Sequence, residues 1–201
     1  LIKTSLGVSE DFTIICCARR LVEKNGVIYL LKAISQSSFL KNEVICLIAG
    51  DGPELHNISD FVKSEKLENV KILGSQNSTE MLRIYQISDI SVVPSITING
   101  LQEATSITAL ESMSCQLITV ASEIGGLRQM ISNGIDGFLF PEKNYIELSK
   151  ILEEIVANIE SYRSVGDTAR LKVHQLYSNT IASRKYTHVF SSAIRESNNE
   201  N

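Results

Sequence analysis

Six short apolar runs constrain the fold more than any other feature of this sequence. Most of them are continuous rather than alternating, which is typical of β-strands covered on both faces. Between the runs, apolar residues recur at helical spacing. Strand and helix therefore alternate, which predicts an α/β fold with a doubly wound parallel sheet of about six strands. The six runs span residues 12–18, 43–50, 70–73, 90–94, 116–121 and 137–140.

Local signals place the starts of two intervening helices. Pro53 is expected in the first turn of a helix over 53–67, because proline suits that position. Ser78 is expected to cap a helix over 78–88.

The last quarter of the chain has no further strand pattern. Helical spacing continues through 145–159 and 180–194, so two or three helices are expected to close the domain. We predict one domain over residues 1–197 and a disordered polar tail over 198–201. The early first strand suggests a chain cut out of something larger.

Composition narrows the class of protein. The chain has 201 residues, 43% of them apolar, and a net charge of -4, which suits one globular core. Because phosphate backbones are bound through clustered positive charge and no Lys/Arg stripe is visible, we expect no nucleic-acid partner. No apolar run reaches the roughly 18 residues of a membrane span, and no signal-peptide pattern is present, so we expect a cytoplasmic protein.

Cysteine and histidine show no metal-ligand spacing. Cys16, Cys17 and Cys46 lie in apolar runs, and Cys115 follows a helical pattern, so we expect buried free thiols. The three histidines are scattered, and no metal site is predicted.

Sheets of this kind bind ligands outside the carboxyl ends of their strands, so four loops are candidate ligand-binding loops. Gly50 and Gly52 lack the third glycine of a dinucleotide fingerprint, which favours a tight turn over a phosphate cradle. The basic residues of 19–26 could bind a diphosphate or form a solvated loop. The glycine pair in 122–126 could begin a helix that faces an anion or form a plain turn. The fourth loop is 94–106.

Two acids, Glu103 and Glu111, lie eight positions apart in "QEATSITALESMSC". On one continuous helix they would be about 12 Å apart along the axis, which does not suit a glycosidase pair. Thr105 and Ser106 are instead good helix caps, which places Glu103 in the preceding loop and Glu111 in the second turn.

This arrangement has two interpretations. The two acids could contact the two polar ends of one extended ligand, with the amides near Ser106 and Ile107 facing an anion between them. Alternatively, Thr108 and Glu111 form a capping box and Glu103 is a surface acid.

Several motifs occur in register along the chain. "RRLVEKNGVIYLLKAI" resembles a G-R-L-x-x-x-K-G opening, and "LIAGDGPE" resembles the strand and turn that follow it. "ISDISVVPS" resembles A-D-x-x-V-x-P-S, and "EATSITALESMSCQLITVASEIGG" resembles E-x7-E followed by A-x-G-x-P-V-V-A-x-x-x-G-G. Together they resemble the group-4 retaining glycosyltransferases (glycosyl transferases group 1), which have the two-domain GT-B fold. The resemblance covers nearly the whole chain, but only the Rossmann-like C-terminal half of such an enzyme.

The resemblance implies roles for matching residues. Glu103 would contact hydroxyls of the donor sugar, Glu111 would bind the ribose, and Arg20 would pair with the diphosphate. Glu103, Arg20 and Lys24 are expected to be catalytic, with no metal and no cofactor beyond a UDP- or GDP-linked sugar donor. The further expected donor-binding residues are Ser106, Ile107, Thr105, Gly50, Ser95 and Leu73.

The resemblance also implies partners. The acceptor domain, expected N-terminal to this one, is absent from the chain, so the isolated domain should bind donor without transferring sugar. The full enzyme could associate with the inner face of a membrane during surface polysaccharide or glycolipid assembly.

The chain departs from the family pattern at several positions. Arg19 replaces glycine, Asn25 replaces lysine with Lys24 one position early, and Glu103-Ala104-Thr105-Ser106 replaces E-G-F-G. The altered loop from Arg19 to Asn25 supports an alternative in which a degenerate, noncatalytic domain serves as an interaction or regulatory module. A GT-B epimerase is a third alternative.

Overall fold

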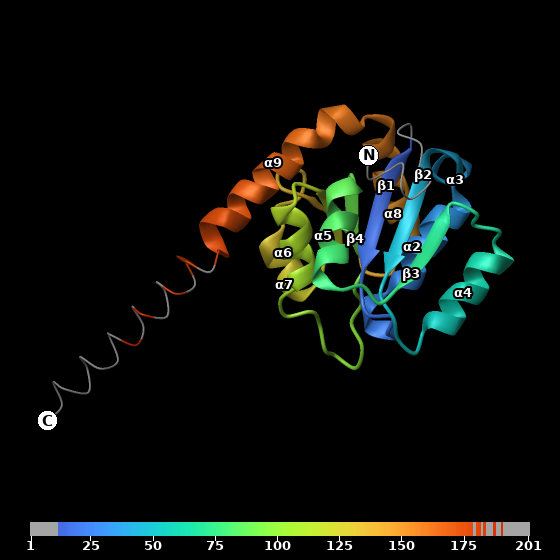
Figure 1. Cartoon of the computed structure of the whole chain (residues 1–201), viewed down its shortest axis with the longest axis horizontal. Coiled ribbons are helices and arrows are strands. Elements are labelled where there is room, and N and C mark those ends of the chain that lie inside the picture. Colours follow the sequence, from blue (N-terminus) through green and yellow to red (C-terminus); the bar gives the residue numbers. More distant parts are fainter. Residues whose placement is uncertain (1–11, 179, 182, 184–186, 188–189, 191–201) are drawn as a thin grey trace, which may run out of the picture.

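The fold is a parallel sheet of six strands with helices on both faces (Figure 1). The computed structural model describes residues 12–178, 180–181, 183, 187 and 190. The strand order β3-β2-β1-β4-β5-β6 is that of a doubly wound sheet. The sequence-based fold class is therefore confirmed. The strands are β1 (Thr13–Ala18), β2 (Val44–Ala49), β3 (Val70–Gly74), β4 (Ile90–Val93), β5 (Ile118–Ser122) and β6 (Phe138–Phe140).

Helices connect the strands and close the domain. α8 begins at Tyr145, as predicted, whereas α9 begins at Ile159, at the end of the first predicted helical segment and well before the second. Most of that second segment, 180–194, and the predicted tail, 198–201, lie outside the described residues. The helical elements are η1 (Glu23–Asn25), α2 (Val27–Gln36), α3 (Ser38–Glu43), α4 (Leu55–Ser64), α5 (Ser78–Ile87), α6 (Ile107–Ser114), α7 (Gly125–Met130), α8 (Tyr145–Ala157) and α9 (Ile159–Leu176).

The sheet is buried on both faces, which explains why its strands are continuous apolar runs. In β1, Ile15 and Cys17 pack into a core with α2, α4 and α8. Their neighbours Ile14 and Cys16 pack on the opposite face, against α5. Every residue of β2, β4 and β5 is buried. This two-sided burial is what the absence of alternation predicts.

The cysteines follow this burial. Cys16, Cys17 and Cys46 are fully buried free thiols, as expected. Burial raises the pKa of the Cys16 thiol to about 11 and that of Cys17 to about 12. Cys115 differs from the prediction because it is only partly buried.

The starts of α4 and α5 also differ from the prediction. α4 begins at Leu55, so Pro53 precedes the helix. The intervening Glu54 amide donates to the carbonyl of Leu21, which ties this turn to the loop after β1. α5 is capped by Asn77 rather than Ser78, because Asn77 and Glu80 form a reciprocal capping box.

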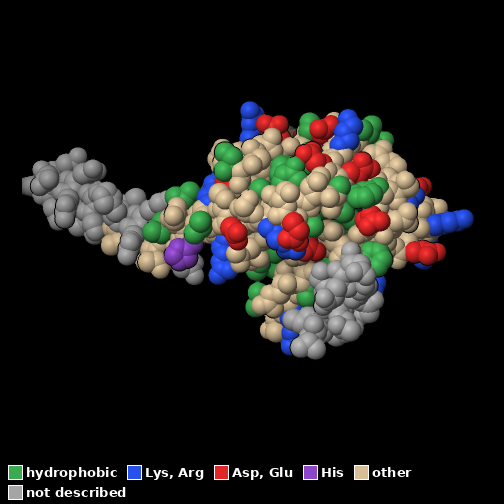
Figure 2. Space-filling view, turned by 90° about the horizontal axis from the view of Figure 1, so that it is seen from above, with side chains coloured by type: hydrophobic (Ala, Val, Ile, Leu, Met, Phe, Trp, Pro, Cys, Tyr) green, Lys and Arg blue, Asp and Glu red, His purple; other side chains and the backbone are tan. Residues whose placement is uncertain are grey.

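The molecular surface carries charges of both signs. On the face seen from above, acidic and basic side chains are interspersed (Figure 2). None of the helices in the described residues is both long and apolar enough to cross a bilayer. The strand order reverses between β1 and β4, and a ligand crevice is expected at the carboxyl ends of these two strands.

Candidate functional site

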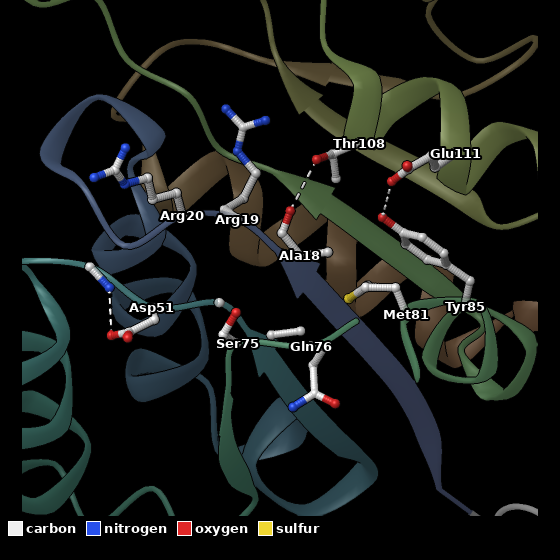
Figure 3. Close-up of a pocket in the computed structure, with 13 residues that line it drawn as sticks. Ala18, Arg19, Arg20, Asp51, Ser75, Gln76, Met81, Tyr85, Thr108 and Glu111 are labelled. Carbon is white, nitrogen blue, oxygen red and sulfur yellow. Dashed lines mark hydrogen bonds between the residues drawn. The ribbon is translucent and has the colours of Figure 1, made fainter. Parts of the chain in front are cut away.

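A cavity of about 500 Å³ opens at the carboxyl edge of the sheet. Figure 3 shows Arg19 and Arg20 leaving the end of β1 on one side of it, with Tyr85 and Glu111 on the other. Its volume suits a small-molecule ligand. The lining residues are Ala18, Arg19, Arg20, Ala49, Gly50, Asp51, Gly52, Ser75, Gln76, Met81, Tyr85, Thr108 and Glu111.

A second cavity, of about 530 Å³, shares the end of β1 with the first. It contains Glu103 and Lys24, whereas Glu111 lines only the first of these two cavities. Arg19, Arg20 and Thr108 line both. The two acids of the sequence motif therefore face two adjoining cavities that meet at Arg19 and Arg20. The second cavity is lined by Ala18, Arg19, Arg20, Val22, Lys24, Asn25, Glu103 and Thr108.

The glycine turn after β2 forms one wall of the first cavity. A Cβ atom on Gly50 would lie 1.9 Å from the carbonyl oxygen of Arg19, and one on Gly52 would lie 2.3 Å from that of Leu21. Glycine is therefore required for this turn to pack against the loop after β1. The Gly50 amide donates to the Gly74 carbonyl. These contacts confirm the tight-turn interpretation.

The loops after β1 and β4 are joined through their backbones. The amide of Ile96 donates to the carbonyl of Lys24 over 2.8 Å. Gly26 has a φ of 62°, and a Cβ there would lie 1.9 Å from the carbonyl oxygen of Pro94. The side chain of Lys24 remains exposed beside the second cavity.

Arg19 is the centre of a buried polar network. Its Nη2 donates to Glu103 Oε2 over 2.7 Å, to Asn25 Oδ1 over 2.7 Å and to Ser95 Oγ over 2.8 Å. Its Nη1 donates to Ser106 Oγ over 3.2 Å. Ser95 Oγ in turn donates to Glu103 Oε2 over 3.1 Å. Glu103 is thus an internally paired acid rather than a solvated one.

The neighbouring Arg20 has a different environment. Its side chain is exposed, and it lines both cavities. Its carbonyl accepts a hydrogen bond from Asn25 Nδ2 over 2.7 Å, which fixes the backbone of the loop. The guanidinium of Arg20 is therefore the one available to an anionic ligand.

Glu111 is held by a tyrosine. Tyr85 of α5 donates its hydroxyl to Glu111 Oε2 over 3.0 Å (Figure 3). The pKa of Tyr85 is raised above its ordinary value, first by burial and then by the negative charge of Glu111, so the hydroxyl remains a donor. Glu111 itself is exposed.

The cap of α6 overturns the capping-box alternative. Ser106 is the N-cap, and its Oγ accepts from the amide of Ala109 over 3.3 Å. Thr108 instead donates to the carbonyl of Ala18 over 3.0 Å and links α6 to the end of β1 (Figure 3). The predicted placement of Glu103 in the loop and Glu111 in the helix is confirmed.

The glycine pair of α7 supports the Glu103 loop. The amide of Gly126 donates to the carbonyl of Glu103 over 2.7 Å. A Cβ on Gly126 would lie 1.8 Å from the carbonyl oxygen of Ala104. The pair begins a helix, as the first of the two predictions has it, but the Gly126 amide is occupied by the Glu103 carbonyl and is not available to an anion.

The same loop carries a tight turn at its tip. Ile98 and Leu101 exchange backbone hydrogen bonds, with Asn99 and Gly100 between them at φ values of 50° and 76°. Positive φ at two central residues is the geometry that Asn-Gly favours. The tip is exposed, since Leu101 has 77% of its surface accessible.

The remaining predicted residues lie beside the cavities rather than in their linings. Ser95 and Ser106 are buried in the Arg19 network, and Leu73 packs against the core near α5. Thr105 is exposed. Ile107, 70% exposed, lines an apolar groove of about 800 Å³ between α5, α6 and α9.

Sequence reasoning missed Asn25 and Tyr85 as members of the site, and it included Arg19 only among the basic residues of the loop over 19–26. The signal for Arg19 was its position, since a charged residue directly after a buried strand continues the strand's alternation of faces. Tyr85 had no comparable signal. Its contact with Glu111 joins two helices through residues that are 26 positions apart in the sequence.

Solved structures share this fold. Anabaena HepE in complex with UDP-glucose superposes with a TM-score of 0.84 at 21% identity, over 95% of this chain and 51% of that one. The C-terminal domain of a glycosyl transferase group 1 family protein (LpcC) from Francisella tularensis superposes with a TM-score of 0.77 at 18% identity, over 89% of this chain and 92% of that domain. At these identities the likeness shows the fold.

Curated relatives are longer than this chain. An uncharacterized glycosyltransferase of Methanocaldococcus jannaschii is 24% identical over 96% of this chain and 48% of its own length. The gpi3 subunit of phosphatidylinositol N-acetylglucosaminyltransferase from Schizosaccharomyces pombe is 25% identical over 94% of this chain and 40% of its own length. The chain thus spans about half the length of the curated relatives it matches, or less.

The family is identified by a match over most of the chain. The model of the family described as glycosyl transferases group 1 matches residues 1–172. This match confirms the resemblance that the motifs indicate, and the GT-B structures agree with it. The chain therefore belongs to the glycosyl transferases group 1 family.

Proposed function

We propose that this chain is the donor-binding half of a glycosyltransferase that uses a nucleotide-diphosphate sugar. The observation that carries the proposal is the pair of adjoining cavities, with Glu111 in the first, Glu103 in the second and Arg20 lining both. The nucleoside would occupy the first cavity and the sugar the second. The diphosphate would cross between them at Arg20.

Each ligand group then has a suitable partner. Carboxylates accept hydrogen bonds from hydroxyls, so Glu111 would bind the ribose and Glu103 the sugar. The exposed guanidinium of Arg20 suits a diphosphate, because its planar fork binds phosphate oxygens in pairs. Lys24 lines the sugar cavity and would add positive charge there.

The proposed reaction is glycosyl transfer with retention. The oxygen of the acceptor hydroxyl forms a bond to the anomeric carbon on the face from which the diphosphate departs, and the bond between that carbon and the diphosphate oxygen breaks. The hydroxyl proton passes to the departing diphosphate. Negative charge develops on the leaving diphosphate, and preorganised cations stabilise such charge in the transition state. Arg20 and Lys24 supply these cations, so the proposal includes metal-independent transfer.

The acceptor site would come from a second domain. The relatives are about twice as long as the segment that matches this chain. We propose that an N-terminal domain supplies the acceptor site across a cleft, and that the isolated chain binds donor without transferring sugar. One relative in Corynebacterium glutamicum is named as a GDP-mannose-dependent mannosyltransferase of a phosphatidylinositol mannoside. A cytoplasmic enzyme at the inner face of a membrane would fit a lipid acceptor of that kind.

Calorimetric titration of the chain with UDP, GDP and ADP tests this function. For a sugar nucleotide, an arginine contact, two carboxylate contacts and a helix start would give about 4 to 7 kcal/mol, or a Kd between about 1 mM and 10 µM. A nucleotide without the sugar lacks the Glu103 contact and should bind toward the millimolar end of this range. Glu111→Ala and Arg20→Ala should remove binding of the preferred nucleotide. The matched controls Glu65→Ala and Arg128→Ala change exposed residues that line neither cavity and should bind like the parent chain.

A second candidate is a noncatalytic interaction module. The observation that favours it is the ion pair between Arg19 and Glu103, because that acid already has a partner within the chain. Failure of all three nucleotides to bind at millimolar concentration would favour this candidate over the donor-binding domain.

A further inference from the structure

We propose that Arg19 is a positioning residue that fixes Glu103 through one carboxylate oxygen and presents the other to the donor sugar. This inference rests on the proposed function and assigns a residue that contacts no ligand itself. Arg19 lines both cavities but is only 7% exposed, and both of its terminal nitrogens donate to side chains of the protein. Its guanidinium therefore acts inside the protein rather than on the diphosphate.

The hydrogen bonds to Glu103 are asymmetric. Arg19 Nη2 and Ser95 Oγ both donate to Oε2, over 2.7 and 3.1 Å. Within the part of the chain that the structure describes, Oε1 receives no side-chain hydrogen bond. The Glu103 side chain is 16% exposed and lines the second cavity. One oxygen is therefore fixed and the other is left for a ligand hydroxyl.

The network also determines where the guanidinium can point. Asn25, Ser95 and Ser106 supply three neutral acceptors around Arg19, and Glu103 supplies the charged one. A buried cation needs this set of partners, because breaking one buried charge pair leaves the other charge uncompensated. Arg19 Nε remains without a hydrogen-bond partner among the described residues. Among these residues, the two terminal nitrogens of the guanidinium therefore have hydrogen-bond acceptors, whereas Nε does not.

Three positions of the network are positions where the chain departs from the family pattern. They are Arg19, Asn25 and Ser106, and each of the last two accepts directly from Arg19. These three departures from the family pattern therefore belong to one hydrogen-bond network. Arg20 keeps its exposed position beside the network, so the two consecutive arginines have separate tasks.

This division predicts a specific thermodynamic signature. If Arg19 acts only through Glu103, its replacement should reduce the affinity gained from the sugar and spare the affinity for the nucleotide. Arg20 should show the opposite pattern, because the diphosphate is present in both ligands.

The test is calorimetry of the full chain with UDP and with UDP-glucose, and a parallel series with GDP and GDP-mannose. The variants are Arg19→Lys, Arg19→Met and Ser95→Ala, with Arg128→Met as the matched exposed control. Arg19→Met should lower the ratio of sugar-nucleotide affinity to nucleotide affinity by about tenfold, since one charged hydrogen bond is lost. Arg19→Lys keeps the charge and should recover part of the ratio. Ser95→Ala, which keeps the ion pair, should lower it by about threefold. Thermal unfolding of each variant verifies that it is folded at the temperature of the titration.

Each outcome decides the matter. A fall in the ratio for Arg19→Met and Ser95→Ala with unchanged nucleotide affinity supports the inference. An equal fall for both ligands, or no change for folded Arg19→Lys and Ser95→Ala, overturns it. A parent chain that binds nucleotide but gains nothing from the sugar overturns the inference while the nucleotide part of the proposed function stands. A parent chain that binds no nucleotide overturns the proposed function and, with it, this inference.

Discussion

Glu103 and Glu111 lie eight residues apart in the sequence, yet they are held in opposite ways. Glu103 is mostly buried and paired with the cation Arg19. Glu111 is exposed on α6 and held by the neutral hydroxyl of Tyr85. Two acids of one motif can thus contribute differently to the stability of the fold. Glu103 helps to hold the loops after β1 and β4 together, whereas Glu111 lies on the exposed face of α6.

The largest expected effect separates the two acids by stability. Glu103→Ala leaves the buried Arg19 without its counter-charge and should lower the free energy of unfolding by about 3 kcal/mol, the low end of the range because Glu103 is partly exposed. Glu111→Ala should lower it by about 1 kcal/mol, because the hydroxyl of Tyr85 loses its acceptor at the wall of a cavity. Urea denaturation of both variants measures the difference. Equal losses would contradict the contrast between them.

Gly126→Ala tests whether the position of the loop that carries Glu103 depends on its backbone contact with α7. The new Cβ would lie 1.8 Å from the carbonyl oxygen of Ala104, so the loop or the helix must move. The expected loss of unfolding free energy is about 1 to 3 kcal/mol. Sugar-dependent affinity should fall with it, whereas nucleotide affinity, which relies on Glu111, should change little. Gly134→Ala is the control for a loss of stability alone: a Cβ there meets nothing within 4 Å, but the φ of 76° makes alanine cost about 1 to 2 kcal/mol, and sugar-dependent affinity should not change.

Tyr85→Phe tests the other acid. The substitution removes the hydroxyl that orients Glu111 and keeps the ring that fills the core. Discrimination between UDP and 2′-deoxy-UDP should fall about fivefold, because one hydrogen bond that orients the acid proposed to bind the ribose is lost. Calorimetry with both nucleotides measures it. Undiminished discrimination would mean that Glu111 needs no support from Tyr85.

The smallest effect uses Cys115 as a probe of the charge on Glu111. Burial and then the charge of Glu111 raise the pKa of this thiol, so less thiolate is present at a given pH. Glu111→Gln should lower that pKa and speed alkylation by iodoacetamide at pH 8 by roughly twofold, because the thiolate is the reactive form. The rates should converge at a pH above both thiol pKa values. Glu103→Gln should leave the rate unchanged, and mass spectrometry can identify the alkylated cysteine.

The sheet could be predicted because burial on both faces requires continuous runs of apolar residues, which are visible in the sequence. The runs that became β2, β4 and β5 are apolar at nearly every position, and turn glycines such as Gly50 separate strand from helix. The placement of Glu103 and Glu111 was equally accessible, because Ser106 is a strong helix cap.

The supporting partners of the two acids were harder to predict. Two arginines follow β1, and composition does not say which one is buried. The pairing of β1 with β2 continues through the Arg19 amide, which donates to Ala49, so alternation puts Arg19 on the face of Cys17. The alternation of side chains along β1 could therefore have predicted that Arg19 is the buried arginine. The Tyr85 contact depends on how α5 and α6 pack, and no local pattern encodes that.

The Asn99–Gly100 turn lies in the loop between β4 and α6, and it allows the length of that loop to change without moving Glu103. The turn is closed by its own backbone hydrogen bonds at Ile98 and Leu101, and Glu103 is fixed beyond it by Arg19 and Gly126. A Cβ on Gly100 meets nothing within 4 Å, so the tip has room. Exposed turns of this kind tolerate insertion. The tip is therefore where evolution or an engineer could lengthen the chain without moving Glu103, the carboxylate that we propose binds the donor sugar.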